Sequence, residues 1–170
     1  MYLDEFLHYL EHEKNMAQNT QEAYKRDVLD FFAFLQGNGL EHAAQVSNTH
    51  VVSYLLRLKG DNKSAATVNR KLASVRAYFN FLVEKGQVRQ NPTTGIKSPK
   101  IERKELEYLT LEEVDKLLAM PDRSVRGVRD RAILELLYAT GIRVGELVGL
   151  DIDDVDRGRR TVRVDGKGGR

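Results

Sequence analysis

The sequence predicts a mainly α-helical protein: a four-helix bundle first, a linker after it, and then further helices that lead into one β-strand. Apolar residues recur at three- and four-residue spacing through most of the chain, which is the period of an amphipathic helix. Ser, Asn or Gly marks most points where such a pattern starts or stops. Strict alternation, the period of a strand, is confined to residues 160–164.

The first half of the chain carries the four expected helices. Their expected ranges are 2–14, a cap at Asn19 or Thr20 to Gln36, a cap at Ser47 to Gly60, and a cap at Ser64 to Gly86. Their inward positions are Leu3, Phe6, Leu7, Leu10, Tyr24, Val28, Phe31, Phe32, Leu35, Val51, Tyr54, Leu55, Leu58, Val68, Leu72, Val75, Phe79 and Leu82. Four such helices with short connections predict a compact bundle, which we assign to residues 1–90.

Residues 91–107 are predicted to be an interdomain linker, because they hold two of the three prolines and few apolar residues. The basic residues of this segment are Lys97, Lys100, Arg103 and Lys104. Such a segment either serves solubility alone or crosses a phosphate backbone, and its composition is compatible with both.

A second domain is expected over residues 108–170. Thr110 and Glu113 form a capping box that opens a helix reaching Met120. The further elements are a helix over 125–140 with Val128, Ala132, Ile133, Leu136 and Leu137 inward, a short helix over 143–149, a strand over 160–164 and the start of a turn at Asp165 and Gly166. No return strand follows, so the strand is expected to lack a partner and the chain to end within a structural element.

The composition narrows the function classes. The 170 residues include no cysteine, which excludes disulfides, thiol nucleophiles and cysteine-ligated metals. His8 and His12 stand one helical turn apart, but no third ligand is evident, so a solvated helix face is favoured over a metal site. No apolar run approaches the roughly 20 residues of a membrane span, and no signal peptide is evident. We expect a soluble, cytoplasmic protein without a cofactor.

The charge of the chain is unevenly distributed, although the net charge is only +2. Residues 1–56 hold 3 Lys and Arg against 8 Asp and Glu, residues 57–104 hold 12 against 3, and the last fourteen residues hold 6 against 1. Two basic stretches on a nearly neutral chain fit contact with one polyanion. Ordinary surface charge is the alternative.

Two cations stand at positions that suggest chemistry. Arg143 follows a break at Gly141 and starts a short helix, where positive charge is unfavourable for the helix dipole. Lys167 lies between glycines, which let a backbone approach a ligand closely. Two such cations can clamp a phosphate and stabilise developing charge. The alternatives are a local pair of Arg143 with Glu146 and a solvated hairpin lysine.

Several stretches resemble one family. T-G-I-R-V-G-E-L, from Thr140 to Leu147, resembles the first arginine motif of the tyrosine recombinases, the phage-integrase family. N-T-Q-E-A-Y-K-R-D-V (19–28) and T-V-N-R-K-L-A-S-V-R-A-Y-F-N-F-L (67–82) are similar to parts of the family's SAM-like core-binding domain, and N-P-T-T-G-I-K-S-P-K (91–100) is similar to its linker. V-D-G-K-G-G-R (164–170) resembles the hairpin of the catalytic lysine. The resemblance covers nearly the whole chain and looks closest to the Xer chromosome-dimer recombinases.

The resemblance implies roles for three residues. Arg143 matches the arginine that grips the scissile phosphate, which a guanidinium can do with two parallel hydrogen bonds. Lys167 matches the general acid that protonates the leaving 5′-hydroxyl. Glu146 matches an acidic position that helps to hold the active site. In the family a tyrosine forms a 3′-phosphotyrosyl link, so strands are exchanged without ATP or metal.

The chain departs from the family pattern after Lys167. The family also needs a His-x-x-Arg, a further His or Trp, and the nucleophilic tyrosine, all downstream of that lysine. None of the seven tyrosines, at positions 2, 9, 24, 54, 78, 108 and 138, falls in a matching place. We therefore expect the N-terminal part of a recombinase, with a whole core-binding domain and an incomplete catalytic domain, which binds DNA but does not cleave it.

The expected DNA contacts come from two helices and the linker. The fourth helix is predicted to turn one polar face away from Val68, Leu72 and Val75, and such a face fits the major groove. Its residues are Thr67, Arg70, Lys71 and Ser74. Matching contacts from the second helix are Thr20, Lys25 and Arg26, and those from the linker are Lys97, Lys100, Arg103 and Lys104. A plain solvated face is the alternative.

The function implied by the resemblance is site-specific DNA recombination, of the chromosome-dimer-resolution or integration type. Family members act as four protomers around two duplexes. Two other classes remain open. One is a naturally short DNA-binding regulator without catalysis, against which the expected unpaired strand argues. The other is a helical module that binds protein rather than DNA.

Overall fold

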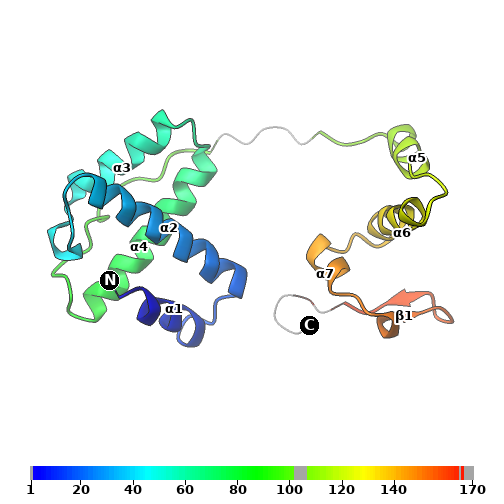
Figure 1. Cartoon of the computed structure of the whole chain (residues 1–170), viewed down its shortest axis with the longest axis horizontal. Coiled ribbons are helices and arrows are strands. Elements are labelled where there is room, and N and C mark those ends of the chain that lie inside the picture. Colours follow the sequence, from blue (N-terminus) through cyan, green and yellow to red (C-terminus); the bar gives the residue numbers. More distant parts are fainter. Residues whose placement is uncertain (1, 102–106, 165, 167–170) are drawn as a thin grey trace. The chain divides into compact units, whose positions relative to one another are not determined.

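The chain folds into two compact units, Met1–Arg103 and Lys104–Arg170, in a computed structural model that describes residues 2–101, 107–164 and 166. The described residues are mainly helical, as Figure 1 shows. They include one two-stranded sheet. The predicted fold class is therefore confirmed.

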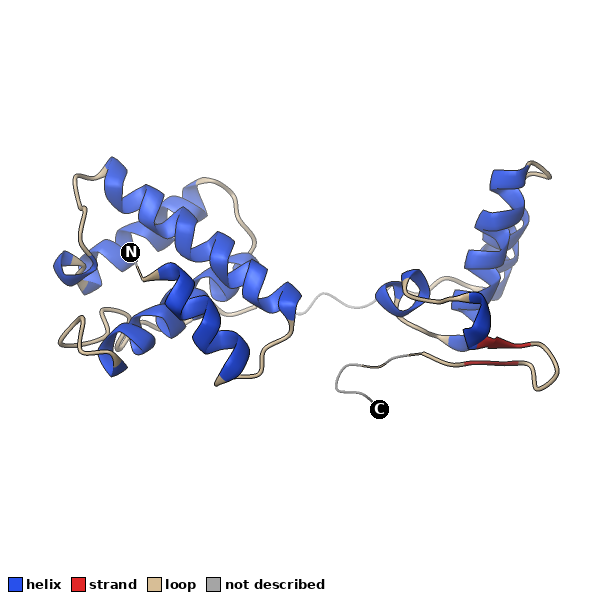
Figure 2. Ribbon diagram, turned by 60° about the horizontal axis from the view of Figure 1, so that its bottom comes forward, coloured by secondary structure: helices blue, strands red, loops and turns tan. Residues whose placement is uncertain are grey.

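The first unit is a bundle of four helices. They are α1 (Leu3–His12), α2 (Gln18–Gly37), α3 (Asn48–Gly60) and α4 (Ala65–Glu84), with a short 3-10 turn at Ala43–Gln45. Helix α2 packs against α4 and α1, and α3 packs against both α4 and α2. Figure 2 shows the same bundle from a second direction.

The core of this unit is rich in aromatic side chains. The Phe6 ring meets the Tyr78 ring edge-on with centroids 5.1 Å apart, and Phe31 meets Tyr54 in the same way at 5.0 Å. This geometry is the one that aromatic pairs prefer. Every inward position predicted for the four helices is buried in this core or packed against it, which confirms the predicted helical faces.

The helix starts are only partly as predicted. Ser64 caps α4, and its Oγ accepts a hydrogen bond from the Thr67 backbone N–H at 3.2 Å. The predicted cap of α2 was wrong, because that helix begins at Gln18 after Ala17 and holds Asn19 and Thr20 within its first turn. An N-cap residue has non-helical backbone, as Ala17 has with ψ 145°, whereas Asn19 and Thr20 already lie inside the helix.

The structure differs from the sequence prediction at the expected linker. Residues 91–99 lie on the first unit, held by side chains of α4. Arg76 donates from Nη2 to the Ile96 carbonyl oxygen at 2.9 Å, and Asn69 donates from Nδ2 to the Pro99 carbonyl oxygen at 2.9 Å. Thr93 is 2% exposed. This segment therefore belongs to the bundle surface, and the chain leaves the first unit later than residue 91.

The second unit contains three helices and a short hairpin among its described residues. They are α5 (Leu111–Ala119), α6 (Val125–Thr140), α7 (Val144–Val148), a 3-10 turn at Ile152–Asp154, β1 (Val155–Asp156) and β2 (Thr161–Val162). The capping box of α5 is confirmed, since Glu113 Oε2 accepts from the Thr110 N–H at 2.7 Å and Thr110 Oγ1 accepts from the Glu113 N–H at 3.3 Å. Gly141 ends α6 with φ 65°, in the left-handed region that glycine adopts without strain.

The expectation that the strand near residues 160–164 lacks a partner was wrong. Strand β2 pairs with β1 in antiparallel register, with Val155 opposite Val162. The partner precedes the strand, and the chain reverses between them with Arg160 at φ 55°. The predicted turn after the strand includes Asp165, which lies outside the described residues.

The apolar face of α6 is largely uncovered. Val128, predicted to point inward, is 61% exposed, and Ala132 is exposed as well. Ile133, Leu136 and Leu137 are half-buried. None of the helices in the described part of the chain, α6 included, has the length and apolar content needed to span a bilayer.

Candidate functional site

Arg143 stands at the start of α7, where the break at Gly141 separates α7 from α6. Its backbone N–H donates to Glu146 Oε2 at 2.7 Å, and its Nη1 donates to Glu146 Oε1 at 2.7 Å. The local pair that the sequence offered as an alternative is therefore present. It leaves the Arg143 side chain 79% exposed, whereas that of Glu146 is only 12% exposed. An arginine carries five N–H donors, so most of the Arg143 fork stays open to a second acceptor.

Glu146 acts as the anchor of this arrangement. The backbone N–H of Arg143, and then its guanidinium, hold the pKa of the Glu146 carboxyl below its usual range. The carboxyl is therefore ionised at neutral pH and binds the arginine through a charge-assisted hydrogen bond. A pair of this kind can present a guanidinium to a phosphate in a defined orientation.

Three of the predicted site residues are not described by the structure. Lys167, Arg103 and Lys104 lie outside the described residues. Their predicted roles, as the general acid and as two DNA contacts, stay predictions.

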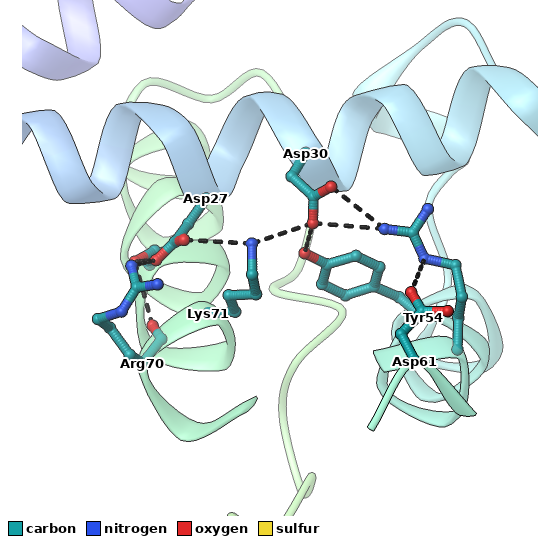
Figure 3. A network of polar contacts seen from close by, with 8 residues as sticks. Asp27, Asp30, Tyr54, Asp61, Arg70 and Lys71 are labelled. Atoms are coloured by element: carbon teal, nitrogen blue, oxygen red, sulfur yellow. Dashed lines mark hydrogen bonds and ion pairs between the residues drawn. The ribbon is translucent and has the colours of Figure 1, made fainter. Parts of the chain in front are cut away.

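A second polar cluster joins α2 and α4 in the first unit (Figure 3). Its centre is Asp27, whose side chain is 2% exposed. The carboxylate pairs with Arg70 and, at 3.3 Å, with Lys71 Nζ, and it accepts a hydrogen bond from Ser74 Oγ at 2.9 Å. Buried carboxylates require such partners, because an unpaired buried charge is strongly destabilising.

Asp30 extends the cluster toward α3, one helical turn after Asp27. It accepts from the Tyr54 hydroxyl at 2.6 Å, from Lys71 Nζ at 3.0 Å and from Arg57 Nη2 at 3.2 Å. Partial burial disfavours its charged form, but the hydrogen bonds from Tyr54 and Lys71 and the charges of Lys71 and Arg57 outweigh burial and lower the pKa of Asp30. The cluster therefore holds three cations and two carboxylates in fixed positions at the surface of the bundle.

Most of the predicted DNA contacts of the first unit reach its surface. The exposed ones are Lys25, Arg26, Arg70, Lys97 and Lys100, and the partly buried ones are Thr20, Thr67 and Lys71. The placement of Ser74 on the exposed face was wrong, because Ser74 is 0% exposed. Its small hydroxyl fits inside the bundle, since it donates to the buried Asp27 carboxylate and lies 3.1 Å from the Arg70 carbonyl oxygen.

The sequence reasoning did not identify Asp27, Asp30 and Arg57 as members of a site. A signal for Asp27 was present, because it stands three residues after Tyr24 and directly before Val28, within the apolar stripe of α2. Aspartate is rarely fully buried unless it is paired. An acidic residue at an inward position therefore predicts an internal ion pair, although not the identity of its partner.

The histidine pair shows no ligand set. The rings of His8 and His12 lie with centroids 4.1 Å apart on the exposed face of α1. Across the described ranges, no three His, Asp or Glu side chains gather in a way that would hold a metal ion.

Two family models match the chain. The phage integrase N-terminal SAM-like domain matches residues 3–86, and the phage integrase family matches residues 107–170. The chain therefore belongs to the phage integrase family of tyrosine recombinases, as the arginine motif and the core-binding helices indicate.

The chain is similar to curated Xer proteins over nearly its whole length. It is 42% identical over 170 residues to tyrosine recombinase XerC of Roseiflexus castenholzii, which covers 99% of this chain and 54% of that protein. It is 34% identical over 167 residues to tyrosine recombinase XerD of Oceanobacillus iheyensis, covering 98% of this chain and 56% of that protein. The chain thus spans about half the length of the curated relatives that it matches.

A solved structure with a similar fold is the lambda integrase tetramer bound to a Holliday junction. It matches with a TM-score of 0.75 and 22% identity, over 99% of this chain and 47% of the integrase chain. At this identity the likeness shows a shared fold.

Proposed function

We propose that this chain supplies the DNA-binding domain and part of the phosphate-binding site of a site-specific tyrosine recombinase. The observation that carries this proposal is the setting of Arg143. Its guanidinium is anchored by Glu146 at 2.7 Å and yet is 79% exposed, so it is oriented and still free to receive an anion. The resemblance to the XerC and XerD recombinases supports the same role.

In this proposal Arg143 binds two non-bridging oxygens of the scissile phosphate, and Glu146 keeps its guanidinium in the required orientation. The hydrogen bonds from Arg143 to these two oxygens strengthen as negative charge develops on the phosphoryl group during its transfer to a tyrosine. Lys167 protonates the 5′-oxygen that leaves. The product is a 3′-phosphotyrosyl link, which stores the bond energy for rejoining during chromosome-dimer resolution or integration.

We further propose that the 170-residue chain binds DNA without cleaving it. Three of its tyrosines, Tyr9, Tyr54 and Tyr78, are buried in the bundle and cannot reach a phosphate. Burial, and for Tyr54 the neighbouring Asp30, also raises the pKa of Tyr54 and Tyr78, which disfavours a phenolate nucleophile. The family pattern places the attacking tyrosine after the catalytic lysine, so in this proposal none of the seven tyrosines of this chain is the nucleophile.

DNA binding is proposed to use a basic surface made from α2, α4 and the segment after them. Its described residues are Thr20, Lys25, Arg26, Thr67, Arg70, Lys97 and Lys100. Arg103 and Lys104, which lie outside the described residues, are proposed as further DNA contacts. We propose that the core-binding domain of residues 1–90 and the catalytic portion of residues 108–170 each contact the duplex. Four such protomers would act on two duplexes, and the solved lambda integrase tetramer is bound to a Holliday junction.

The first test measures the salt dependence of duplex binding by this chain. If about five phosphates are contacted, the logarithm of the association constant should fall with the logarithm of salt concentration with a slope of roughly −4 to −5. Replacing the exposed Lys25 with Met should make the slope shallower by about 0.9, the contribution of one phosphate contact. A flat salt response would rule out the phosphate contacts and favour a module that binds protein.

The second test joins residues 1–170 to the C-terminal half of the Roseiflexus castenholzii relative and follows the covalent protein–DNA adduct on a nicked substrate. Arg143→Ala should raise the barrier of cleavage by at least about 3 kcal/mol, the effect of losing one preorganised donor. Duplex affinity should remain nearly unchanged. Arg143→Lys, which keeps the charge but loses the fork, is the matched control and should recover little activity. Cleavage by Arg143→Ala at near-normal rate would refute the assignment.

A second candidate is a naturally short regulator that occupies recombination sites without cutting them. An unpaired terminal strand would have spoken against such a protein, but β2 is paired with β1, so that objection no longer holds. The native coding sequence beyond codon 170 separates the two proposals. A reading frame that continues to a His-x-x-Arg and a late tyrosine supports the recombinase, and a stop codon supports the regulator.

A further inference from the structure

Asp27 lies where the interior of the bundle meets its basic surface. Its carboxylate is held from inside by Ser74 Oγ at 2.9 Å and by Lys71 Nζ at 3.3 Å, and it pairs with Arg70 toward the outside. With only 2% of the side chain exposed, Asp27 has little freedom to move. Asp27 can therefore hold the charged group of a surface side chain in a fixed position through an ion pair.

The two neighbouring cations of α4, Arg70 and Lys71, make different contacts with the carboxylates and differ in exposure. Lys71 is 13% exposed, and its Nζ lies between the carboxylates of Asp27 and Asp30 at 3.3 and 3.0 Å, as Figure 3 shows. Arg70 is 46% exposed and contacts Asp27 through Nη1. Because the guanidinium is a planar fork with five donors, a bond at Nη1 leaves donors for another acceptor.

The ion pair between Asp27 and Arg70 lowers the entropic cost of DNA binding by Arg70. A long surface side chain loses rotamer freedom when it binds DNA, and that loss opposes association. In the free protein the Asp27 carboxylate already restricts Arg70. The negative charge of Asp27 would repel DNA if it stood alone, but Lys71 at 3.3 Å compensates it. The result is a preoriented guanidinium at little electrostatic cost.

We infer that Asp27 is a positioning residue for DNA binding, which orients Arg70 toward the duplex, and that Lys71 is the counter-ion of the two carboxylates and makes no DNA contact. The inference rests on the proposed DNA-binding function. Within the basic surface, it identifies Arg70 as the preoriented side chain and Asp27 as the residue that orients it.

The test compares Asp27→Asn with Asp30→Asn by fluorescence anisotropy of a labelled random-sequence duplex. Each change removes one negative charge from α2 and one partner of Lys71, but only Asp27 contacts Arg70. If charge alone mattered, both variants would bind more tightly than wild type. Positioning predicts that Asp27→Asn binds about fivefold more weakly, roughly the effect of ordering one long side chain, while Asp30→Asn does not weaken binding.

A double-mutant cycle with Arg70→Ala assigns the effect to Arg70. In the Arg70→Ala background, Asp27→Asn should no longer weaken binding, and a loss of the same size there would overturn the inference. Circular dichroism melts verify that each variant is folded. If Asp27→Asn is not, Ser74→Ala serves instead, because it keeps every charge, loosens Asp27 and should produce a smaller loss that again requires Arg70.

Arginine side-chain NMR supplies a readout that needs no DNA. The Arg70 Nε–H signal should report a restricted side chain in wild type and in Asp30→Asn, and an averaged one in Asp27→Asn. An equally mobile Arg70 in all three would overturn the inference. A wild-type chain that does not bind the duplex overturns the proposed function and this inference with it, whereas binding with equal effects of the two variants overturns this inference alone.

Discussion

Tyr54 connects the aromatic core to the ion pairs of the first unit. Its ring packs edge-on against Phe31 at 5.0 Å, and its hydroxyl donates to Asp30 Oδ2 at 2.6 Å. Burial, then the hydrogen bond to Asp30 and the charge of that carboxylate, raise the pKa of Tyr54 far above its ordinary value of 10.0. The neutral phenol is therefore part of the folded structure, and its ionisation is coupled to unfolding.

The sign of this coupling gives a prediction at alkaline pH. Because folding raises the pKa of Tyr54, its contribution to stability is complete below pH 10 and is lost as the pH rises above that value. Burial also raises the pKa of Tyr78 to about 12. In an alkaline titration, the phenolate absorbance of these two tyrosines should appear only together with loss of the helical circular dichroism signal.

Tyr54→Phe is the control for this titration. It should lower the free energy of unfolding at neutral pH by about 1 kcal/mol, the net value of one hydrogen bond, and remove one phenolate from the late step. A complete phenolate signal from a chain that keeps its helical spectrum would contradict the coupling.

For single residues, the sequence predicted the Arg143–Glu146 pair as an alternative, but it placed Ser74 on an exposed face although Ser74 is buried. The difference is one of distance along the chain. Residues three apart at a helix start are neighbours by geometry. Ser74 is buried because of Asp27, which is 47 residues away on another helix. A helical pattern describes each helix by itself, so it cannot show which polar group a neighbouring helix turns inward.

Among the elements, the segment that follows α4 is held in place by the hydrogen bonds of Asn91. The amide of Asn91 donates to Asn80 Oδ1 at 2.6 Å and to the Arg76 carbonyl oxygen at 3.0 Å, while its Oδ1 accepts from the N–H and the hydroxyl of Thr93 at 2.8 Å each. The first two bonds fix the start of the segment on α4, and the other two hold the turn from Asn91 to Thr93. Because Thr93 is buried, its N–H and hydroxyl would find little water to replace these bonds if the Asn91 amide were removed while the segment stayed in place.

Asn91→Ala should therefore lower the free energy of unfolding of the first unit by about 1–3 kcal/mol, the cost of leaving partly buried polar groups unpaired. Urea denaturation followed by circular dichroism measures this. The matched control is Gln90→Ala at the adjacent exposed position, which should change stability by no more than about 0.5 kcal/mol. Equal effects of the two substitutions would mean that the segment is not held through Asn91.

The sequence predicted the helices more completely than the segments between them. Helices leave a long periodic pattern, and the inward faces of α1 to α4 were found from it. Prolines and few apolar residues correctly marked 91–99 as non-helical, but its attachment depends on Asn and Arg side chains of other elements. Strand β1 spans only Val155–Asp156, which is too short to show alternation, so a partner for β2 was expected only on its other side.

Across the whole chain, burial is distributed unevenly between the two units. All buried hydrophobic side chains among the described residues belong to the first unit. In the described part of the second unit only Gly127 is buried, where an added Cβ would collide with the Asp122 carbonyl oxygen. Large apolar side chains there are open to solvent, with Val125 at 90% and Ile152 at 91% exposure. Burial of apolar surface makes the largest favourable contribution to folding, so the two units should differ strongly in stability.

Hydrogen exchange measured by mass spectrometry tests this difference. Amides of α2 and α4 should exchange slowly, through global unfolding of the bundle, whereas amides of α6 should exchange rapidly, because few buried contacts oppose local opening. A shortened chain of residues 1–103 should keep the urea midpoint and the m-value of the full chain, since the m-value follows the surface exposed on cooperative unfolding. Protection of α6 equal to that of α4 would contradict this prediction. It would mean that the second unit of this chain buries its apolar faces, for instance against another copy, which a concentration dependence of the protection would reveal.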